Sequence, residues 1–351
     1  MHFPQVNILG MMSGTSLDGL DLCLVKFKGK GLIEWEILKA ETRSYEQGLV
    51  DRLRVAHLQS DEEIERLNNV LGQRFASDAE DFCHGHHVDL IATHGHTIKH
   101  RPDLGYTLQI GDPSPIYEKL RCPMVYDFRS QDVVLGGQGA PLVPIGDKML
   151  FGEYDFCVNL GGFANFSTEI EGRQTAGDIC AVNVVLNKLA ERLGFSYDDG
   201  GRIAREGRAD SDLLLTLNEL NFYELPGPKS LGRECVDQEI WPLLDASKLN
   251  TEDLLATFVE HSAVQIARII SNGQALFTGG GVRNDFLMER IRRNSGSEIV
   301  IPDGDLVDFK EALIFALLGL LRVRDQINVL SSVTGAKHDH CSGQILGDIS
   351  V

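Results

Sequence analysis

Small residues follow apolar runs at three places in the sequence, in a pattern suited to binding phosphate. The segments are GMMSGTSLDG at residues 10–19, VNLGGFANFS at 158–167 and ALFTGGGVRN at 275–284. Glycine allows backbone N–H groups to approach an anion closely, and neighbouring hydroxyl groups add further donors. The first two segments predict β-hairpins, and the third predicts a strand, a glycine turn and a helix.

The first segment carries side chains for both phosphate and metal. Ser13, Thr15 and Ser16 supply hydroxyl groups, while Asp18 and Asp21 supply carboxylates for Mg²⁺ or its water ligands. No Gly-Lys-Ser/Thr run follows, so the segment is not a Walker A loop. A tight, solvated hairpin turn is the alternative interpretation.

The second and third segments add weight to phosphate binding. Two glycine hairpins, one in each half of the chain, can hold a triphosphate from both sides of a cleft. The third turn would let a nucleotide base or ribose lie against bare backbone. Its alternative is a strand-to-helix turn that needs glycine for close packing. Together the three segments predict a nucleotide-binding cleft.

The order of the predicted elements indicates a duplicated α/β chain. A hairpin opens each half, strands come before helices in both, and 351 residues suit two domains. We expect domains at residues 1–150 and 151–351, and leave open whether the last helix packs back across the cleft. Helices are predicted over residues 61–83, 182–193 before Gly194, 252–270 after an N-cap at Thr251, and 311–321.

The composition limits the partners. A net charge of −18 argues against a protein that binds nucleic acid or an anionic membrane. No apolar run reaches the ~18 residues of a membrane span, and the first residues lack a signal-peptide pattern. Seven scattered cysteines without a CxxC pair are typical of reduced thiols. We therefore expect a soluble, cytoplasmic protein with no nucleic-acid and no membrane partner.

Specific strings run along nearly the whole chain. They are GMMSGTSLDG at 10–19, THGHT at 93–97, LQIGD at 108–112, DFR at 127–129, GGQGAPL at 136–142, VNLGG at 158–162, PKS at 228–230 with GRE at 232–234, and FTGGGVRN at 277–284. In this order they resemble the anhydro-N-acetylmuramic acid kinase family, and GGQGAPL is the most specific of them. The paired glycine hairpins resemble, more broadly, the actin, Hsp70 and hexokinase superfamily. This implies a duplicated ribonuclease H-like fold of two α/β domains with a central cleft.

The resemblance implies an ATP-dependent sugar kinase. Such an enzyme opens the bridge of 1,6-anhydro-N-acetylmuramic acid with water and phosphorylates O6, giving N-acetylmuramic acid 6-phosphate in peptidoglycan recycling. ATP and Mg²⁺ are the expected cofactors, the amino sugar and ATP are the expected small-molecule partners, and a homodimer is expected. The residues that we assign to ATP are Gly10, Ser13, Gly14, Thr15, Ser16, Asp18, Gly161, Gly162, Asn165, Gly279, Gly280, Gly281 and Asn284.

A general base must take a proton from the attacking water, and the resemblance gives this role to Asp178. We place Asp178 at a helix start, where the helix dipole favours its ionised form. Capping of that helix is the alternative. The family pattern continues with Gly-Pro-Gly-Asn or similar, whereas this chain has Cys180, Ala181, Val182 and Asn183. We expect a stiffer loop with extra side chains near the sugar, and Asn183 in register as a sugar contact.

The lactyl carboxylate of the expected sugar calls for a cationic contact. Arg129 is the first choice, and a surface ion pair with Asp127 or Asp132 is its alternative. Lys229 and Arg233 are weaker candidates, since they could equally contact the second half of the chain or solvent.

Six of the eleven histidines lie close together in the sequence: His84, His86, His87, His94, His96 and His100. They lack the cysteine partners or the His-Glu-x-x-His pattern of a zinc site. His94, His96 and Thr97 follow a predicted strand at 88–93, where α/β folds place ligands, so we expect them to contact the sugar. The family residue at His96 is usually glutamine. Glu311 matches a family glutamate and is expected to contact the sugar, with charge stabilisation at a helix N-terminus as the alternative.

Two other functions stay open at this point. Another sugar kinase or a phosphohydrolase of the same fold would share the glycine hairpins, but not the DFR and GGQGAPL strings. A non-catalytic nucleotide switch or polymer subunit would share the fold, although the sequence shows no peptide-binding appendix or long disordered tail. The altered segment after Asp178 also leaves room for a degenerate nucleotide-binding member of the family. Because the fold alone cannot choose among them, ATP turnover that depends on a sugar is the deciding observation.

Overall fold

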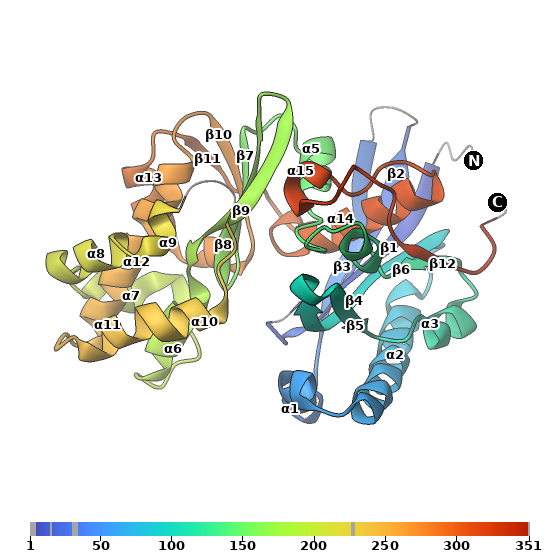
Figure 1. Cartoon of the computed structure of the whole chain (residues 1–351), viewed down its shortest axis with the longest axis horizontal. Coiled ribbons are helices and arrows are strands. Elements are labelled where there is room, and N and C mark those ends of the chain that lie inside the picture. The colour runs from blue at the N-terminus through green and yellow to red at the C-terminus, as the bar shows by residue number, and fades with distance from the viewer. Residues whose placement is uncertain (1–4, 15, 30–33, 226–228, 350–351) are drawn as a thin grey trace. The chain divides into compact units, whose positions relative to one another are not determined.

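The chain folds into two α/β units (Figure 1). The computed structural model describes residues 5–14, 16–29, 34–225 and 229–349. The first unit holds the residues up to Leu150 together with those from Phe309 onward, and the second holds Phe151–Asp308. Residues 309–351, which we had placed in the second domain, thus group with the first.

Packing of the last long helix explains this grouping. Helix α14 (Leu306–Val323) lies so close to strand β1 (Gln5–Ser13) that a Cβ on Gly10 would fall 1.9 Å from the carbonyl oxygen of Ala312. A Cβ on Gly319 would likewise fall 2.6 Å from Ala92. Two glycines therefore allow the helix to lie directly on the first sheet.

The first unit is built on a seven-stranded sheet. Its order is β12-β6-β4-β1-β2-β3, with β5 paired to β4. Strands β1, β2 and β3 form an antiparallel meander, while β1, β4 and β6 run parallel. The strands after β1 are β2 (Gly19–Lys28), β3 (Glu34–Ser44), β4 (Leu90–Arg101), β5 (Tyr106–Ile110), β6 (Met124–Tyr126) and β12 (Gln344–Leu346).

The second unit repeats this plan with five strands in the order β11-β10-β7-β8-β9. Strands β7, β8 and β9 form an antiparallel meander, and β10 and β11 are added parallel to β7. The strands are β7 (Phe156–Leu160), β8 (Phe163–Ile170), β9 (Arg173–Ala181), β10 (Gln274–Thr278) and β11 (Glu298–Val300). A meander followed by parallel strands, present twice, confirms the duplicated α/β fold of the actin and hexokinase class. The two predicted hairpins and the strand–turn–helix are confirmed with it.

Helices cover the sheets and complete both cores. In the first unit they are α1 (Gln47–Val55), α2 (Asp61–Cys83), α3 (Pro113–Leu120), α4 (Ser130–Val134), α5 (Pro144–Leu150), α14 and α15 (Ser331–Thr334). In the second they are α6 (Asn183–Glu191), α7 (Arg202–Glu206), α8 (Ser211–Asn218), α9 (Asn221–Glu224), α10 (Arg233–Cys235), α11 (Trp241–Ala246), α12 (Thr251–Ile269) and α13 (Asp285–Asn294). Short helical turns are η1 (Ala56–Leu58), η2 (Pro102–Leu104), η3 (Asp199–Gly201), η4 (Val236–Ile240) and η5 (Gly280–Arg283).

The helix predictions differ from the structure mainly at their ends. Helix α2 has the predicted bounds, and its apolar residues at intervals of three and four are buried. Helix α12 begins at Thr251, because Asn250 is the N-cap and its side chain accepts the N–H of Asp253 at 2.7 Å. Helix α14 begins at Leu306, so Glu311 lies one turn inside it and not at its N-terminus.

Two further expectations can be compared with the structure. The structure joins none of the seven cysteines in a disulfide. Within the residues described, none of the helices has the length and apolar character that crossing a bilayer requires.

Candidate active site

The first glycine segment forms the turn between β1 and β2. Gly14, Ser16 and Asp18 lie in this turn, where Ser16 Oγ donates to Asp18 Oδ1 at 2.7 Å. Ser13 ends β1 and is buried, and its Oγ contacts Tyr45 Oη at 2.6 Å. Gly10 lies inside β1 under α14, so close packing already accounts for its lack of a side chain. Thr15 lies outside the described residues.

The two carboxylates proposed for metal lie near this turn. Asp18 is exposed, whereas Asp21 is half-buried on β2 and its Oδ1 accepts the hydroxyl of Thr42 at 2.6 Å. In the ranges that the structure covers, no group of three or more histidine, cysteine, aspartate or glutamate side chains is arranged to hold a metal ion. Asp18 and Asp21 are therefore oxygen donors at the turn and not a complete metal site.

The second glycine turn joins β7 to β8 and accepts hydrogen bonds from residues at the start of α6. The Asn183 side-chain amide donates to the Gly161 carbonyl at 2.9 Å. The backbone N–H groups of Val182 and Val184 donate to the Gly162 carbonyl at 2.9 and 3.1 Å. Asn183, which we expected at the sugar, thus has its amide engaged in fixing the glycine turn.

The third glycine turn follows β10, beside the end of β7. Two of its glycines are required for packing. A Cβ on Gly279 would lie 2.6 Å from Asn159 Oδ1, and one on Gly281 would lie 2.7 Å from the Leu160 side chain. Gly280 is exposed and a Cβ there would meet nothing within 4 Å, so its bare backbone is open to a ligand. Because β7 and β10 are parallel, both turns lie at the carboxyl edge of the sheet, the usual ligand edge of α/β folds.

Two asparagines assigned to ATP have different environments. Asn284 is the N-cap of α13, and its Oδ1 accepts the N–H of Leu287 at 3.0 Å. Asn165 is exposed on β8, with Asn159 and Asp178 as its partners on the neighbouring strands. Asn165 therefore lies in a polar row that crosses the sheet and includes the proposed base.

Asp178 lies within strand β9 and not at a helix start. The N-cap of α6 is Val182, which makes no side-chain cap, so the capping interpretation of Asp178 is wrong. Asp178 Oδ2 accepts the N–H of Leu231 at 2.8 Å and the hydroxyl of Ser230 at 3.4 Å. Burial raises the pKa of Asp178, and these two hydrogen bonds oppose the rise. The helix dipole is thus not what sets its proton affinity, and burial makes it a stronger base than an exposed aspartate.

The departure from the family pattern next to Asp178 faces the protein core. Cys180, Ala181 and Val182 are fully buried, and Cys180 Sγ lies 3.8 Å from the carbonyl of Ser262 on α12. Burial raises the pKa of the Cys180 thiol. The expectation that these side chains crowd the sugar is therefore wrong, because they fill the interior of the second unit.

Arg129 is held by two contacts in the first unit. Its Nε donates to His94 Nε2 at 2.8 Å, and its Nη1 donates to the Gly139 carbonyl at 2.5 Å. Its Nη2 makes no hydrogen bond to any residue that the structure describes. Neither Asp127 nor Asp132 forms an ion pair with it within that part of the chain, so the surface-ion-pair interpretation fails.

The proton positions on His94 follow from its partners. Nδ1 lies 2.9 Å from the Gly95 carbonyl, which can only accept, so Nδ1 carries the hydrogen. Nε2 is then free to accept from Arg129. Burial, and next the charge of Arg129, hold the pKa of His94 well below its ordinary value. His94 is thus a neutral acceptor that orients a cation.

His96 and Thr97 lie inside β4, which continues to Arg101 and not only to Thr93 as predicted. Nδ1 of His96 lies 3.0 Å from Ser13 Oγ, and burial lowers the pKa of His96 to about 4. Thr97 Oγ1 accepts from Gln109 Nε2 at 3.3 Å. His96 therefore links β4 to the first glycine turn.

A cavity of about 230 Å³ opens beside these residues. It is lined by Asn68, Thr93, His94, Gly95, Thr107, Leu108, Gln109, Ile110, Gly111, Pro113, Tyr126, Asp127 and Ser130. Three of the family strings thus meet around one polar hollow of the first unit.

Glu311 lies in the second turn of α14. Its side chain reaches solvent, yet desolvation by the protein around it raises its pKa, and the charges of Arg129 and then Lys310 oppose the rise. Its neighbour Lys310 is buried and pairs with Asp147 of α5 at 2.9 Å. The dipole interpretation of Glu311 fails, because the residue is not in the first turn.

The weaker cationic candidates have other environments. Lys229 Nζ donates to the carbonyl of Phe222, and to that of Leu225 at 3.3 Å, and lies 4.5 Å from the centre of the Phe222 ring. Arg233 is exposed at the start of α10. The Lys229 ammonium group is therefore occupied inside the second unit.

The first three histidines of the sequence cluster, His84, His86 and His87, are exposed, and His87 pairs with Asp89 at 2.9 Å.

Sequence reasoning missed other residues, whose roles depend on contacts over long sequence separations. They are Tyr45, Asn68, Ser230, Thr334 and His340. Ser230 lies in the PKS string at 228–230, which was the one available signal.

A duplicated α/β fold with glycine turns at the carboxyl ends of its strands suits a nucleotide-binding protein, and the family comparison decides which class it belongs to. The family model described as anhydro-N-acetylmuramic acid kinase matches residues 6–348. Relatives of that name occur in Paraburkholderia xenovorans (34% identical, 96% of each chain covered), Synechococcus elongatus (33%; 98% of this chain and 99% of the relative) and Caldanaerobacter subterraneus (32%; 96% of each). This chain belongs to the anhydro-N-acetylmuramic acid kinase family, and the prediction of an ATP-dependent sugar kinase is confirmed.

Proposed function

We propose that the chain uses ATP to convert 1,6-anhydro-N-acetylmuramic acid and water into N-acetylmuramic acid 6-phosphate. Family membership along nearly the whole chain supports the overall reaction. The observation that supports it most directly is the environment of Asp178, a half-buried carboxylate on β9 with a raised pKa and fixed by donors from residues 230 and 231.

Asp178 acts as the general base. Its carboxylate takes a proton from water while the water oxygen bonds to the anomeric carbon, and the bond from that carbon to the bridging O6 breaks. O6 then receives the phosphoryl group, which bound ATP supplies. Leu231 N–H and Ser230 Oγ hold one carboxylate oxygen, so the other is directed to the water. A raised pKa gives a base better matched to neutral pH than an ordinary aspartate.

The glycine turns hold the nucleotide. Gly162 and Gly280 are exposed, and a Cβ added to either residue would have no neighbouring atom within 3.8 Å. Gly279 and Gly281 shape these turns by close packing, and Gly161 does so by accepting the amide of Asn183. The turn at Gly14 and Ser16 supplies further donors for phosphate. Asp18 and Asp21 would hold Mg²⁺ through its water ligands, because carboxylate oxygens suit this ion.

Arg129 binds the lactyl carboxylate of the sugar. Its Nε and Nη1 are fixed by His94 and Gly139, and its Nη2 is left to donate to an anion. Arginine suits this role because its planar fork keeps the remaining donor in a fixed direction. His96, Thr97 and Glu311 complete the polar contacts of the sugar. Asn183 contributes its side-chain oxygen, since its amide holds Gly161.

The setting of the reaction follows from the family and the composition. We place the enzyme in the cytoplasm, as a homodimer, in the recycling of peptidoglycan. The family resemblance supports the homodimer and the pathway, and the composition supports the cytoplasmic location.

The test is release of ADP by the full chain with Mg-ATP and 1,6-anhydro-N-acetylmuramic acid. N-acetylmuramic acid and N-acetylglucosamine are parallel controls, and mass spectrometry identifies the product. We expect turnover with the anhydro sugar alone and a 6-phosphate product. Turnover with another sugar only, or tight ATP binding without any turnover, would overturn the proposal.

A further inference from the structure

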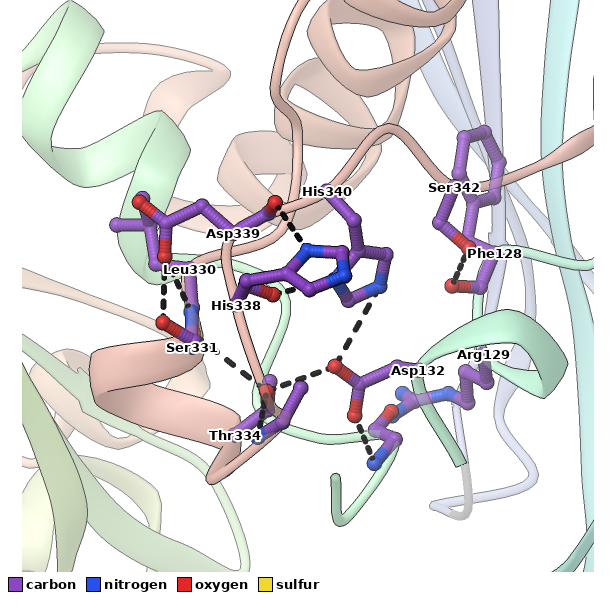
Figure 2. Close-up of polar contacts among 12 residues, drawn as sticks. Phe128, Arg129, Asp132, Leu330, Ser331, Thr334, His338, Asp339, His340 and Ser342 are labelled. Carbon is purple, nitrogen blue, oxygen red and sulfur yellow. Dashed lines mark hydrogen bonds and ion pairs between the residues drawn. The ribbon is translucent and has the colours of Figure 1, made fainter. Parts of the chain in front are cut away.

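A fully buried carboxylate lies beside the GGQGAPL loop and has no role in the reaction proposed above. Asp132 of α4 is 0% exposed. Its Oδ2 accepts the N–H of Gly139 at 2.7 Å, and its Oδ1 accepts the hydroxyl of Thr334 at 2.7 Å (Figure 2). Burying a carboxylate is unfavourable unless donors or charges match it. Here the donors come from segments nearly two hundred residues apart, on the order of half the chain.

The loop is shaped to let this carboxylate approach. A Cβ on Gly137 would lie 2.1 Å from Asp132 Oδ2, so only glycine fits there. The Gly137 N–H also donates to the backbone carbonyl of Asp132 at 2.8 Å. Gly139 has a φ of 69°, in the left-handed region that favours glycine. Gly137 and Gly139 are thus explained by their contacts with Asp132 and by the backbone conformation of the loop.

His340 completes the surroundings of Asp132. The His340 side chain is 3% exposed, and its Nδ1 lies 3.1 Å from the His338 carbonyl, so Nδ1 carries a hydrogen. Its Nε2 points toward Asp132 Oδ1 at 3.5 Å and has no hydrogen-bond partner among the described residues (Figure 2). The charge of Arg129 also acts on Asp132.

Gly139 connects this buried group to the sugar-binding cation. Its N–H is held by Asp132 and its carbonyl accepts from Arg129 Nη1 at 2.5 Å. We propose that Asp132, held by Thr334 and packed against His340, is a positioning residue that fixes Gly139 and thereby orients Arg129 for the carboxylate of the sugar. This inference rests on the proposed function, which assigns Arg129 to that carboxylate. The proposal makes residues 330–342 part of the sugar site, although this segment does not itself touch the sugar.

The experiment compares donor-lacking and donor-keeping variants of the full chain. The donor-lacking variants are Thr334→Val, which removes the hydroxyl that donates to Asp132, and His340→Phe, which removes the Nε2 that lies 3.5 Å from Asp132 Oδ1. The donor-keeping variants, Thr334→Ser and His340→Gln, retain a hydroxyl or an amide at these positions. Ser331→Ala is the matched control, because Ser331 lies on the same segment but donates to the exposed Asp339. Each variant is checked for its Tm, then for hydrogen exchange of the amides at 136–139, and for KM toward the sugar and toward ATP.

We expect Thr334→Val and His340→Phe to speed amide hydrogen exchange at 136–139 and to raise the KM for the sugar about tenfold. A tenfold change corresponds to ~1.4 kcal/mol of binding free energy. KM for ATP should stay unchanged, and Thr334→Ser and His340→Gln should recover most of the loss. Faster exchange without a change in sugar KM, or an equal loss in the donor-keeping variants, would overturn the proposal. If the wild type fails to use the sugar, the proposed function fails instead, and unchanged exchange in the donor-lacking variants would still refute the positioning role separately.

Discussion

Arg129 Nε lies 2.8 Å from His94 Nε2, and burial keeps His94 neutral so that it accepts this hydrogen bond. A histidine usually enters such sites as a proton carrier or metal ligand. Here its second nitrogen is committed to the Gly95 carbonyl, so its task is to orient the guanidinium group.

Replacing His94 should therefore weaken sugar binding and leave the chemistry intact. We expect His94→Phe, which keeps a ring against Phe315 but has no acceptor, to raise the sugar KM about tenfold, in line with a lost hydrogen bond to a charged group. His94→Gln keeps an acceptor and should be affected less. Steady-state kinetics with the sugar varied is the measurement, and equal effects of the two variants would argue against the orienting role.

Asp178→Asn should remove the general base without disturbing the nucleotide. We expect turnover to fall by about 10²–10⁴-fold, the usual contribution of a general base. The affinity for ATP should stay close to that of the wild type, because the glycine turns are untouched. ADP release and calorimetric titration with ATP check the two parts. Near-native turnover of this variant would show that another group accepts the proton.

The pH dependence of the activity should reflect the raised pKa of Asp178. Because burial raises its pKa, activity should fall as pH drops through a value above the ordinary aspartate range, where the base becomes protonated. Ser230→Ala removes a hydrogen bond that lowers this pKa, so the acid limb of kcat/KM should move to higher pH. A profile of the variant that moves to lower pH, or does not move, would contradict this assignment.

Two neighbouring glycines should respond differently to alanine. In Gly281→Ala the new Cβ would lie 2.7 Å from the Leu160 side chain, so the free energy of unfolding should fall by about 1–3 kcal/mol, as is typical of overpacking. Gly280→Ala meets nothing within 4 Å and should keep its Tm. If Gly280 presents bare backbone to the nucleotide, this second variant should still lose affinity for ATP. Thermal unfolding and ATP titration of the pair separate packing from binding.

Much of the fold follows from local patterns in the sequence. The hairpins, the strand–turn–helix and α2 were predicted because alternation, glycine placement and helical period act over a few residues. The start of α14 was missed by five positions, because burial of Val307 and Phe309 depends on partners far along the chain. The grouping of residues 309–351 was missed for the same reason.

The site was predictable in its residue types but not in its contacts. Arg129 was assigned from the charge of its expected ligand, but His94 and Gly139 as its holders require the folded sheet. Asp178 was assigned by resemblance, while its position in β9 reversed the expected cause of its proton affinity from a helix dipole to burial. Asp132 was read as a surface partner, and its complete burial comes from Thr334 and His340, which no local pattern places beside it.

The grouping of the chain termini into one unit has a consequence for synthesis on the ribosome. The second unit is one continuous stretch, Phe151–Asp308, and can fold as soon as it has emerged from the exit tunnel. The first unit cannot close its core until α14 arrives to cover Gly10 and Ala92, and β12 arrives to pair with β6. The nascent chain therefore carries an open first sheet while the second unit is already complete, and a premature stop after Asp308 would leave that sheet uncovered.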